Sequence, residues 1–150
     1  MDKIILRKAE SFDVPLIFSL VKELALFERA PEEVTATIAD YEINGFSEKP
    51  LFDAFILFEN DQLVGFALWY FRFSTWKGKR LYLEDLFVKS EFRSKGYGKL
   101  LMEATIEEAK ITNSKGLMWQ VLDWNQPAID FYTTLGVKMD AGWLNVHLDL

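Results

Sequence analysis

Residues 81–99 read LYLEDLFVKSEFRSKGYGK, and this stretch decides the fold because a strand, a glycine-containing loop and a helix follow one another within it. The nearly continuous apolar run over residues 80–88 predicts a strand buried on both faces. Residues 98–110 predict a helix, because apolar and small side chains recur there at helical spacing: Leu101, Ala104, Thr105 and Ala109. A strand that feeds a helix through a short loop indicates a sheet covered by helices.

The loop of this unit carries the pattern R-x-x-G-x-G, formed by Arg93, Gly96 and Gly98. Glycines let backbone N–H groups turn inward at a helix N-terminus, where free donors and the helix dipole suit a phosphate or pyrophosphate. Lys95 and Lys99 make the loop basic within an acidic chain. The pattern is neither a P-loop nor a G-x-G-x-x-G dinucleotide motif. An ordinary surface turn is the alternative interpretation.

Two adjacent carboxylates, Glu84 and Asp85, interrupt the apolar strand. Neighbouring side chains on a strand point to opposite faces, so the two serve one site only if a bulge twists the strand. A buried carboxylate is costly without a partner, and partial desolvation raises its pKa toward the range of a general base. The pair is therefore a candidate catalytic base, with structural ion pairs to Lys or Arg as the alternative.

The remaining segments extend the same pattern on both sides. Further strands are expected at residues 4–8, 52–59, 62–73, 117–122 and 143–150, and further helices from about residue 13 to 28, over 38–42 and over 126–135. No repeat or linker divides the chain, which predicts a single α/β (α+β) domain over residues 1–150 with a mixed sheet and helices on both faces.

The helix expected after residue 125 has features of its own. Asn125 is placed as an N-cap, followed by Gln126, Pro127 and Ala128, and Tyr132 returns to nearly the same face two turns later. A tyrosine hydroxyl there could donate a proton to a leaving thiolate or alkoxide. Core packing of the Phe131–Tyr132 pair is the alternative interpretation.

Composition excludes several classes of protein. The 150 residues include no cysteine and one histidine, so thiolate nucleophiles and metal sites built on cysteine or histidine clusters are not expected. A net charge of -6 disfavours nucleic acid as a partner. The sequence has no signal-like N-terminus and no apolar run of about 20 residues, so we expect no membrane partner and a cytoplasmic location.

Taken in order, the strand, the R-x-x-G-x-G loop, the helix, the Asn-capped helix and the Phe-Tyr-x-x-Leu-Gly stretch at 131–136 resemble the GNAT superfamily of N-acetyltransferases over almost the whole chain. Residues 22–28 (KELALFE), 74–78 (STWKG) and 81–85 (LYLED) resemble its diamine (spermidine/spermine) N-acetyltransferase group. The Ser-Thr-Trp and Leu-Asp-Trp-Asn forms resemble the thialysine-acetylating branch. The resemblance implies a mostly antiparallel sheet of six to seven strands whose central strands splay apart.

The resemblance also implies that acetyl-CoA is the co-substrate, without a metal. Tyr132 would be the general acid for the departing CoA thiolate. Arg93 would shape the loop or meet a phosphate at its edge. The other cofactor contacts implied are Leu86, Phe87 and Val88 for the acetyl-pantetheine arm, Ser94, Lys95, Gly96, Tyr97, Gly98 and Lys99 for the pyrophosphate, and Asn125, Gln126, Pro127 and Ala128 for the pantetheine side.

For the acceptor, the resemblance implies a small primary amine, either a diamine, a polyamine or a lysine analogue such as thialysine. Glu84 would deprotonate its ammonium through water. The implied acceptor-binding residues are Phe27, Glu28, Ser74, Trp76, Glu84, Asp85, Met118, Trp119 and Gln120, and the group's members form homodimers. Polyamine-selective members carry acidic residues where this chain has Ser74 and Ala141, which favours a shorter or less charged amine. Acetylation of a peptide amine and a non-catalytic acyl-CoA sensor are the alternatives.

Overall fold

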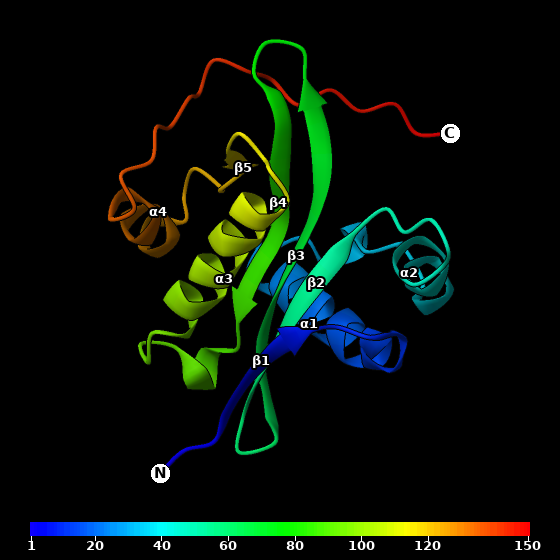
Figure 1. Ribbon diagram of the computed structural model, residues 1–150, viewed down its shortest axis with the longest axis vertical. Coiled ribbons are helices and arrows are strands. Elements are labelled where there is room, and N and C mark those ends of the chain that lie inside the picture. Colours follow the sequence, from blue (N-terminus) through cyan, green and yellow to red (C-terminus); the bar gives the residue numbers. More distant parts are fainter. The chain divides into compact units, whose positions relative to one another are not determined.

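The computed structural model describes residues 1–150, which form two compact units, residues 1–120 and residues 121–150. The first unit contains a sheet of five strands in the order of the sequence: β1 (Ile4–Lys8), β2 (Asp53–Glu59), β3 (Gln62–Ser74), β4 (Gly78–Val88) and β5 (Leu117–Trp119) (Figure 1). Strands β1 to β4 pair antiparallel, and β5 pairs parallel to β4. The mixed, mostly antiparallel sheet is confirmed. The single domain over residues 1–150 stays a prediction.

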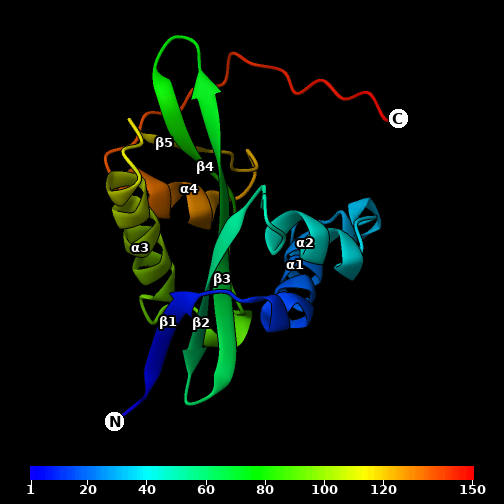
Figure 2. The same ribbon diagram turned by 45° about the vertical axis from the view of Figure 1, so that its right-hand side comes forward.

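Helices cover both faces of this sheet, as predicted. Helices α1 (Val14–Phe27) and α2 (Ile38–Gly45) lie on one face, and α3 (Tyr97–Ile111) lies on the other (Figure 2). Short 3-10 turns occupy Ser11–Asp13, Pro31–Glu33 and Ser90–Phe92. None of the helices has the length and apolarity that crossing a membrane requires.

The core of the first unit lies between α1 and the sheet. Ile17 and Leu20 of α1 are fully buried against Ile56 of β2 and against Phe66 and Leu68 of β3. Removing each such side chain from water stabilises the fold by roughly 1.5–3 kcal/mol. This packing holds β3 and α1 in place, and β3 supplies one side of the site described below.

Local signals explain where several elements begin and turn. Asn60 and Asp61 both adopt positive φ, at 50° and 64°, as a two-residue hairpin turn between β2 and β3 requires. Thr37 and Asp40 form a capping box that starts α2. Asp13 does not cap α1 with its side chain. It is buried and accepts two hydrogen bonds from Arg7, at 2.7 and 2.9 Å.

The second unit contains α4 (Gln126–Thr133) and an extended segment that follows it. One strand prediction is wrong in this unit: residues 143–150 form no strand. The strand expected over residues 117–122, in the first unit, is present but ends at Trp119. The alternating pattern of residues 143–150 fits a pleated strand, but alternation forms a strand only where a ladder of backbone hydrogen bonds to a neighbouring strand supports it. The sheet therefore has five strands rather than six to seven.

Candidate active site

A β-bulge in β4 brings Glu84 and Asp85 to the same side of the sheet. In the register of β3 and β4, Leu68 lies opposite Asp85 and Trp69 lies opposite Leu83, so that Glu84 is the extra residue between two pairs. A bulge leaves its extra residue unpaired and increases the local twist, which removes the strict alternation of neighbouring side chains. The bulge that the sequence analysis required for Glu84 and Asp85 to serve one site is therefore present.

The neighbouring strands β4 and β5 separate at the same place. Their parallel pairing covers only Leu81–Leu117, Tyr82–Met118 and Leu83–Trp119, and it ends at the residue before Glu84. Beyond that point, residues 86–88 pair with β3 on one side, while β5 no longer pairs with them on the other. Beyond Leu83, β4 is therefore not paired with β5. The splayed central strands that the resemblance implies stay a prediction.

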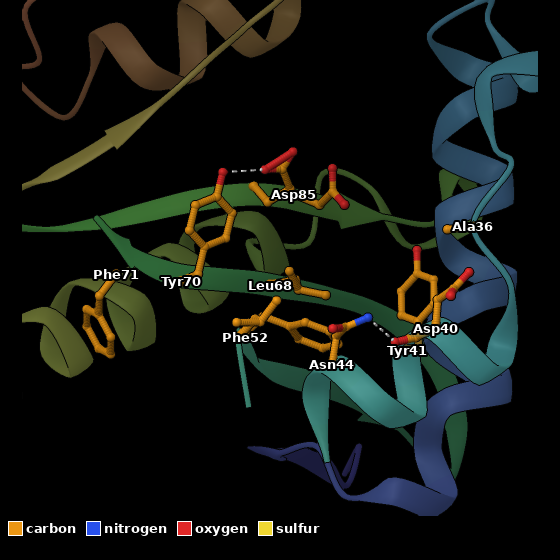
Figure 3. Close-up of a pocket in the computed structure, with 11 residues that line it drawn as sticks. Ala36, Asp40, Tyr41, Asn44, Phe52, Leu68, Tyr70, Phe71 and Asp85 are labelled. Atoms are coloured by element: carbon orange, nitrogen blue, oxygen red, sulfur yellow. Dashed lines mark hydrogen bonds between the residues drawn. The ribbon is translucent and has the colours of Figure 1, made fainter. Parts of the chain in front are cut away.

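Both carboxylates line a pocket with a volume of about 550 Å³, built entirely from the first unit. Figure 3 shows the rings of Tyr41, from α2, and Tyr70, from β3, on either side of Leu68. The pocket residues are Ala36, Asp40, Tyr41, Asn44, Leu51, Phe52, Leu68, Tyr70, Phe71, Glu84 and Asp85. They include acidic and aromatic side chains and no basic one, so the pocket suits a cation.

The two tyrosines of the pocket were not identified from the sequence. The Tyr70 hydroxyl donates a hydrogen bond to the Glu84 carboxylate at 3.0 Å, and its ring stacks on Tyr82. The Tyr41 ring makes edge contacts with Phe18 and Phe52, at 5.6 and 6.0 Å between ring centroids. Burial and the nearby Glu84 charge raise the pKa of each hydroxyl to about 12, so both stay protonated.

Asp85 is the carboxyl of this pocket whose pKa reaches the neutral range. Burial raises its pKa to about 7, with further contributions from the charges of Glu84 and Glu28. Burial also raises the pKa of Glu28. Glu84 and Glu28 therefore lie close enough to Asp85 for their charges to act on it, although Glu28 is not among the residues that line the pocket. A carboxyl with a pKa near 7 can accept a proton from a bound ammonium and release it to solvent.

The loop before α3 has the geometry of an anion site. Gly96 adopts a φ of 84° and Ser94 a φ of 65°, in the left-handed region. The first helical hydrogen bond runs from the Leu100 N–H to the Gly96 carbonyl, which leaves the N–H groups of residues 97–99 without an acceptor in the helix. These donors, with the positive end of the helix dipole, fit a pyrophosphate.

The model of the acetyltransferase (GNAT) family matches residues 17–137, which is most of the chain. The chain belongs to the GNAT acetyltransferase family. It is an acyltransferase that uses acetyl-CoA as co-substrate.

Several characterised relatives of this chain are N-acetyltransferases that are named for small amines. The thialysine N-epsilon-acetyltransferase of Sus scrofa is 32% identical over 92% of this chain and 86% of the relative. The spermidine/spermine N(1)-acetyltransferase-like protein 1 of Homo sapiens is 36% identical over 95% of this chain and 22% of that protein. An aminoglycoside N-acetyltransferase solved in complex with CoA shares the fold, with a TM-score of 0.80 at 18% identity over 100% of this chain and 97% of that one.

Arg93 of the acetyltransferase has a structural role in the loop. Its Nε donates to the Val88 carbonyl at 3.1 Å, and its guanidinium lies over the rings of Phe27 and Phe87, at 4.8 and 5.6 Å from the ring centroids. Arg93 thus joins the end of β4, the end of α1 and the loop. The expectation that it shapes the loop agrees with these contacts, and Phe27 contacts Arg93 rather than lining the pocket.

The other expected acceptor residues are not among the residues of this pocket. Ser74 holds the β3–β4 turn, where its Oγ accepts hydrogen bonds from the backbone N–H groups of Trp76 and Lys77. Trp76 is 86% exposed. Met118 accepts a hydrogen bond from Arg72, Trp119 is paired in β5, and Gln120 follows that strand. A role of these residues toward the acceptor stays a prediction.

The second unit confirms the expected start of its helix. The Asn125 Oδ1 accepts a hydrogen bond from the Ala128 N–H at 3.4 Å, and Pro127 occupies the first turn of α4. Tyr132 is buried on this helix, with its ring 5.4 Å from that of Phe131. Gly136 follows with a φ of 71°, which suits the end of a helix.

Proposed function

We propose that this acetyltransferase transfers the acetyl group of acetyl-CoA to the primary amine of a small cationic acceptor held in the pocket of Glu84 and Asp85. The observation that carries the proposal is the bulge in β4, which places two adjacent carboxylates in the same pocket as Tyr41 and Tyr70. An ammonium is favoured there by the carboxylates and by the aromatic faces. The acceptor class is a diamine, a polyamine or a lysine analogue such as thialysine.

Glu84 and Asp85 perform the first step of the proposed reaction. One of the acceptor ammonium's protons passes, through water, to Glu84, and because the two carboxylates interact, the proton belongs to the pair rather than to one residue. The neutral amine then attacks the thioester carbonyl directly while both substrates are bound. The bond between the carbonyl carbon and sulfur breaks, and the CoA thiolate leaves.

Tyr132 completes the proposed reaction by donating its hydroxyl proton to the departing thiolate. The new amide nitrogen loses a proton to solvent, and solvent returns a proton to the Tyr132 hydroxyl. Residues 86–88 would hold the acetyl-pantetheine arm, the backbone of residues 94–99 the pyrophosphate, and residues 125–128 the pantetheine side.

The names of the relatives support a small amine as acceptor. They include thialysine N-epsilon-acetyltransferases and an L-ornithine N5-acetyltransferase of Arabidopsis thaliana, which is 26% identical over 92% of this chain. Ser74 and Ala141 stand where polyamine-selective members carry acidic residues, so the proposal favours a shorter or less charged amine than spermine. A cytoplasmic location, as expected from the sequence, is part of the proposal.

The proposal includes a homodimer. Trp76 is 86% exposed at the tip of the long β3–β4 hairpin, and a large aromatic side chain in such a position is typical of an interface. In a dimer Trp76 would be covered by the second copy and could then reach an acceptor site. Sedimentation of the protein and of a Trp76→Ala variant tests this: a dimer that the variant weakens supports the proposal, and a monomer at micromolar concentration contradicts it.

The experiment that tests the reaction follows CoA thiol release with thialysine, ornithine, lysine, putrescine, spermidine, spermine and a short peptide, together with calorimetric binding of CoA. We expect turnover with at least one of the small amines, a large loss in the Glu84→Gln variant, and normal rates in the control Glu42→Gln on the exposed face of α2. CoA binding without turnover on any amine would favour the sensor, and turnover only on the peptide would favour a protein substrate.

A further inference from the structure

Glu59 is a buried carboxylate that the proposed reaction does not use. It is the last residue of β2, 7% exposed, and it precedes the Asn60–Asp61 turn. A carboxylate in such a place is costly unless charged or hydrogen-bonding partners compensate for the lost water. The partners of Glu59 therefore indicate what it is for.

Both partners come from the R-x-x-G-x-G loop. The Tyr97 hydroxyl donates a hydrogen bond to Glu59 Oε1 within the protein interior, and the Lys95 Nζ lies 3.1 and 3.3 Å from the two carboxylate oxygens. Tyr97 is itself buried, and its hydrogen bond to Glu59 raises its pKa to about 12. One carboxylate thus holds the residue on each side of Gly96, where the backbone turns into α3.

Glu59 itself is held in the sheet by its position at the end of β2. Glu59 pairs with Ile4 of β1 and with Gln62 of β3. The Asn60 side chain that follows accepts a hydrogen bond from the Lys3 N–H at 2.9 Å, and the Asn60 N–H donates to the Lys3 carbonyl at 2.8 Å. Glu59 therefore offers a fixed point against which the loop can be set.

We propose that Glu59 is a positioning residue for the pyrophosphate of acetyl-CoA: through Tyr97 and Lys95 it orients the free N–H groups at the N-terminus of α3. This inference rests on the proposed cofactor site. Lys95 then acts as a support of the loop and not as a phosphate ligand, because its charge is already paired with Glu59. Backbone N–H groups, rather than the lysine, supply the attraction for the pyrophosphate.

The test compares two acetyl donors in the full-length protein. Acetyl-CoA carries the pyrophosphate and acetyl-pantetheine lacks it, so a positioning role predicts an effect on the first donor alone. We expect Glu59→Gln to raise the Kd for CoA and the KM for acetyl-CoA about tenfold, with kcat/KM for acetyl-pantetheine unchanged. The control is Glu107→Gln, which removes the same group from the exposed face of α3 and leaves both donors unaffected.

Lys95→Met and the double variant separate the two possible roles of the lysine. If Lys95 supports the loop, Lys95→Met weakens CoA binding, adds little in the Glu59→Gln background, and leaves the salt dependence of CoA binding unchanged. If Lys95 is a phosphate ligand, Glu59→Gln frees it and tightens CoA binding, whereas Lys95→Met lowers the salt dependence, and the proposal is overturned.

Two further outcomes have a defined meaning. Equal losses with both donors in Glu59→Gln would show a general structural role and would also overturn the proposal. If the Glu59→Gln variant folds poorly, Tyr97→Phe is the alternative test, because it keeps the ring and removes only the hydroxyl. It should reproduce part of the expected loss of CoA binding. Because CoA binding is measured without an amine, the Kd values test the role of Glu59 even if the proposed class of amine acceptor is wrong.

Discussion

Asp85→Asn should make the protein more stable at pH 8 and less active. Burial and the charges of Glu84 and Glu28 raise the pKa of Asp85 from 3.8 to about 7. The folded protein therefore holds this proton more tightly than the unfolded chain does, so the contribution of Asp85 to stability falls as the pH rises from about 4 to 7 and is level above that range. Integrated between the two pKa values, ionisation of Asp85 costs roughly 4 kcal/mol of stability at pH 8 and less than half of that at pH 5.

The assay is urea unfolding of the protein and the Asp85→Asn variant at pH 5 and pH 8, without substrate. We expect the variant to exceed the unchanged protein in unfolding free energy at pH 8 by roughly 2–3 kcal/mol more than it does at pH 5. Glu48→Gln, which removes one negative charge from the surface, controls for net charge and should show no such difference. An advantage that is equal at the two pH values would refute the argument that burial and neighbouring carboxylates hold the proton on Asp85.

Three further predictions follow from single contacts. Tyr132→Phe should lower kcat about 100-fold while the Kd for acetyl-CoA, measured by calorimetry, stays within about twofold, and equal losses in both would mark a structural residue. Tyr41→Phe should raise the KM for the amine about threefold to tenfold without changing the KM for acetyl-CoA, since only a hydroxyl in the acceptor pocket is lost. Gly65→Ala should destabilise the protein by about 1–3 kcal/mol in urea unfolding, because the new methyl would lie 2.3 Å from the Phe87 carbonyl oxygen and force β3 and β4 apart.

The elements that depend on neighbouring residues could be predicted from the sequence. Helix α3 and strand β4 lie within two residues of their predicted limits, because apolar spacing and the glycine loop are local signals. The cap of α4 by Asn125 was predicted for the same reason. The strand expected at residues 143–150 is not formed, since alternation of side chains describes one strand and cannot tell whether a second strand pairs with it.

The sequence predicted the carboxylates and the glycine loop of the candidate site, but not all of the residues that line its pocket. The carboxylates stood out because they interrupt an apolar strand, and the loop because its glycines precede a helix. Tyr41 and Tyr70 carried no signal, since an aromatic residue on an amphipathic helix or a strand is usually part of a core. The contact of Lys95 with Glu59, 36 residues away in the sequence, could not be predicted from a local pattern.

Local sequence signals account for most helices and strands, for the glycine turn at the start of α3 and for the paired carboxylates in a central strand. The tertiary structure alone decided that Glu84 and Asp85 share one pocket, because a bulge is a property of the register between two strands and not of either one. It also decided the pKa of Asp85, which depends on burial, on the charge of Glu84, and on the charge of Glu28, which folding brings near from just beyond the end of α1. Local patterns fix what each segment can form, and long-range packing fixes which groups meet and how strongly they hold a proton.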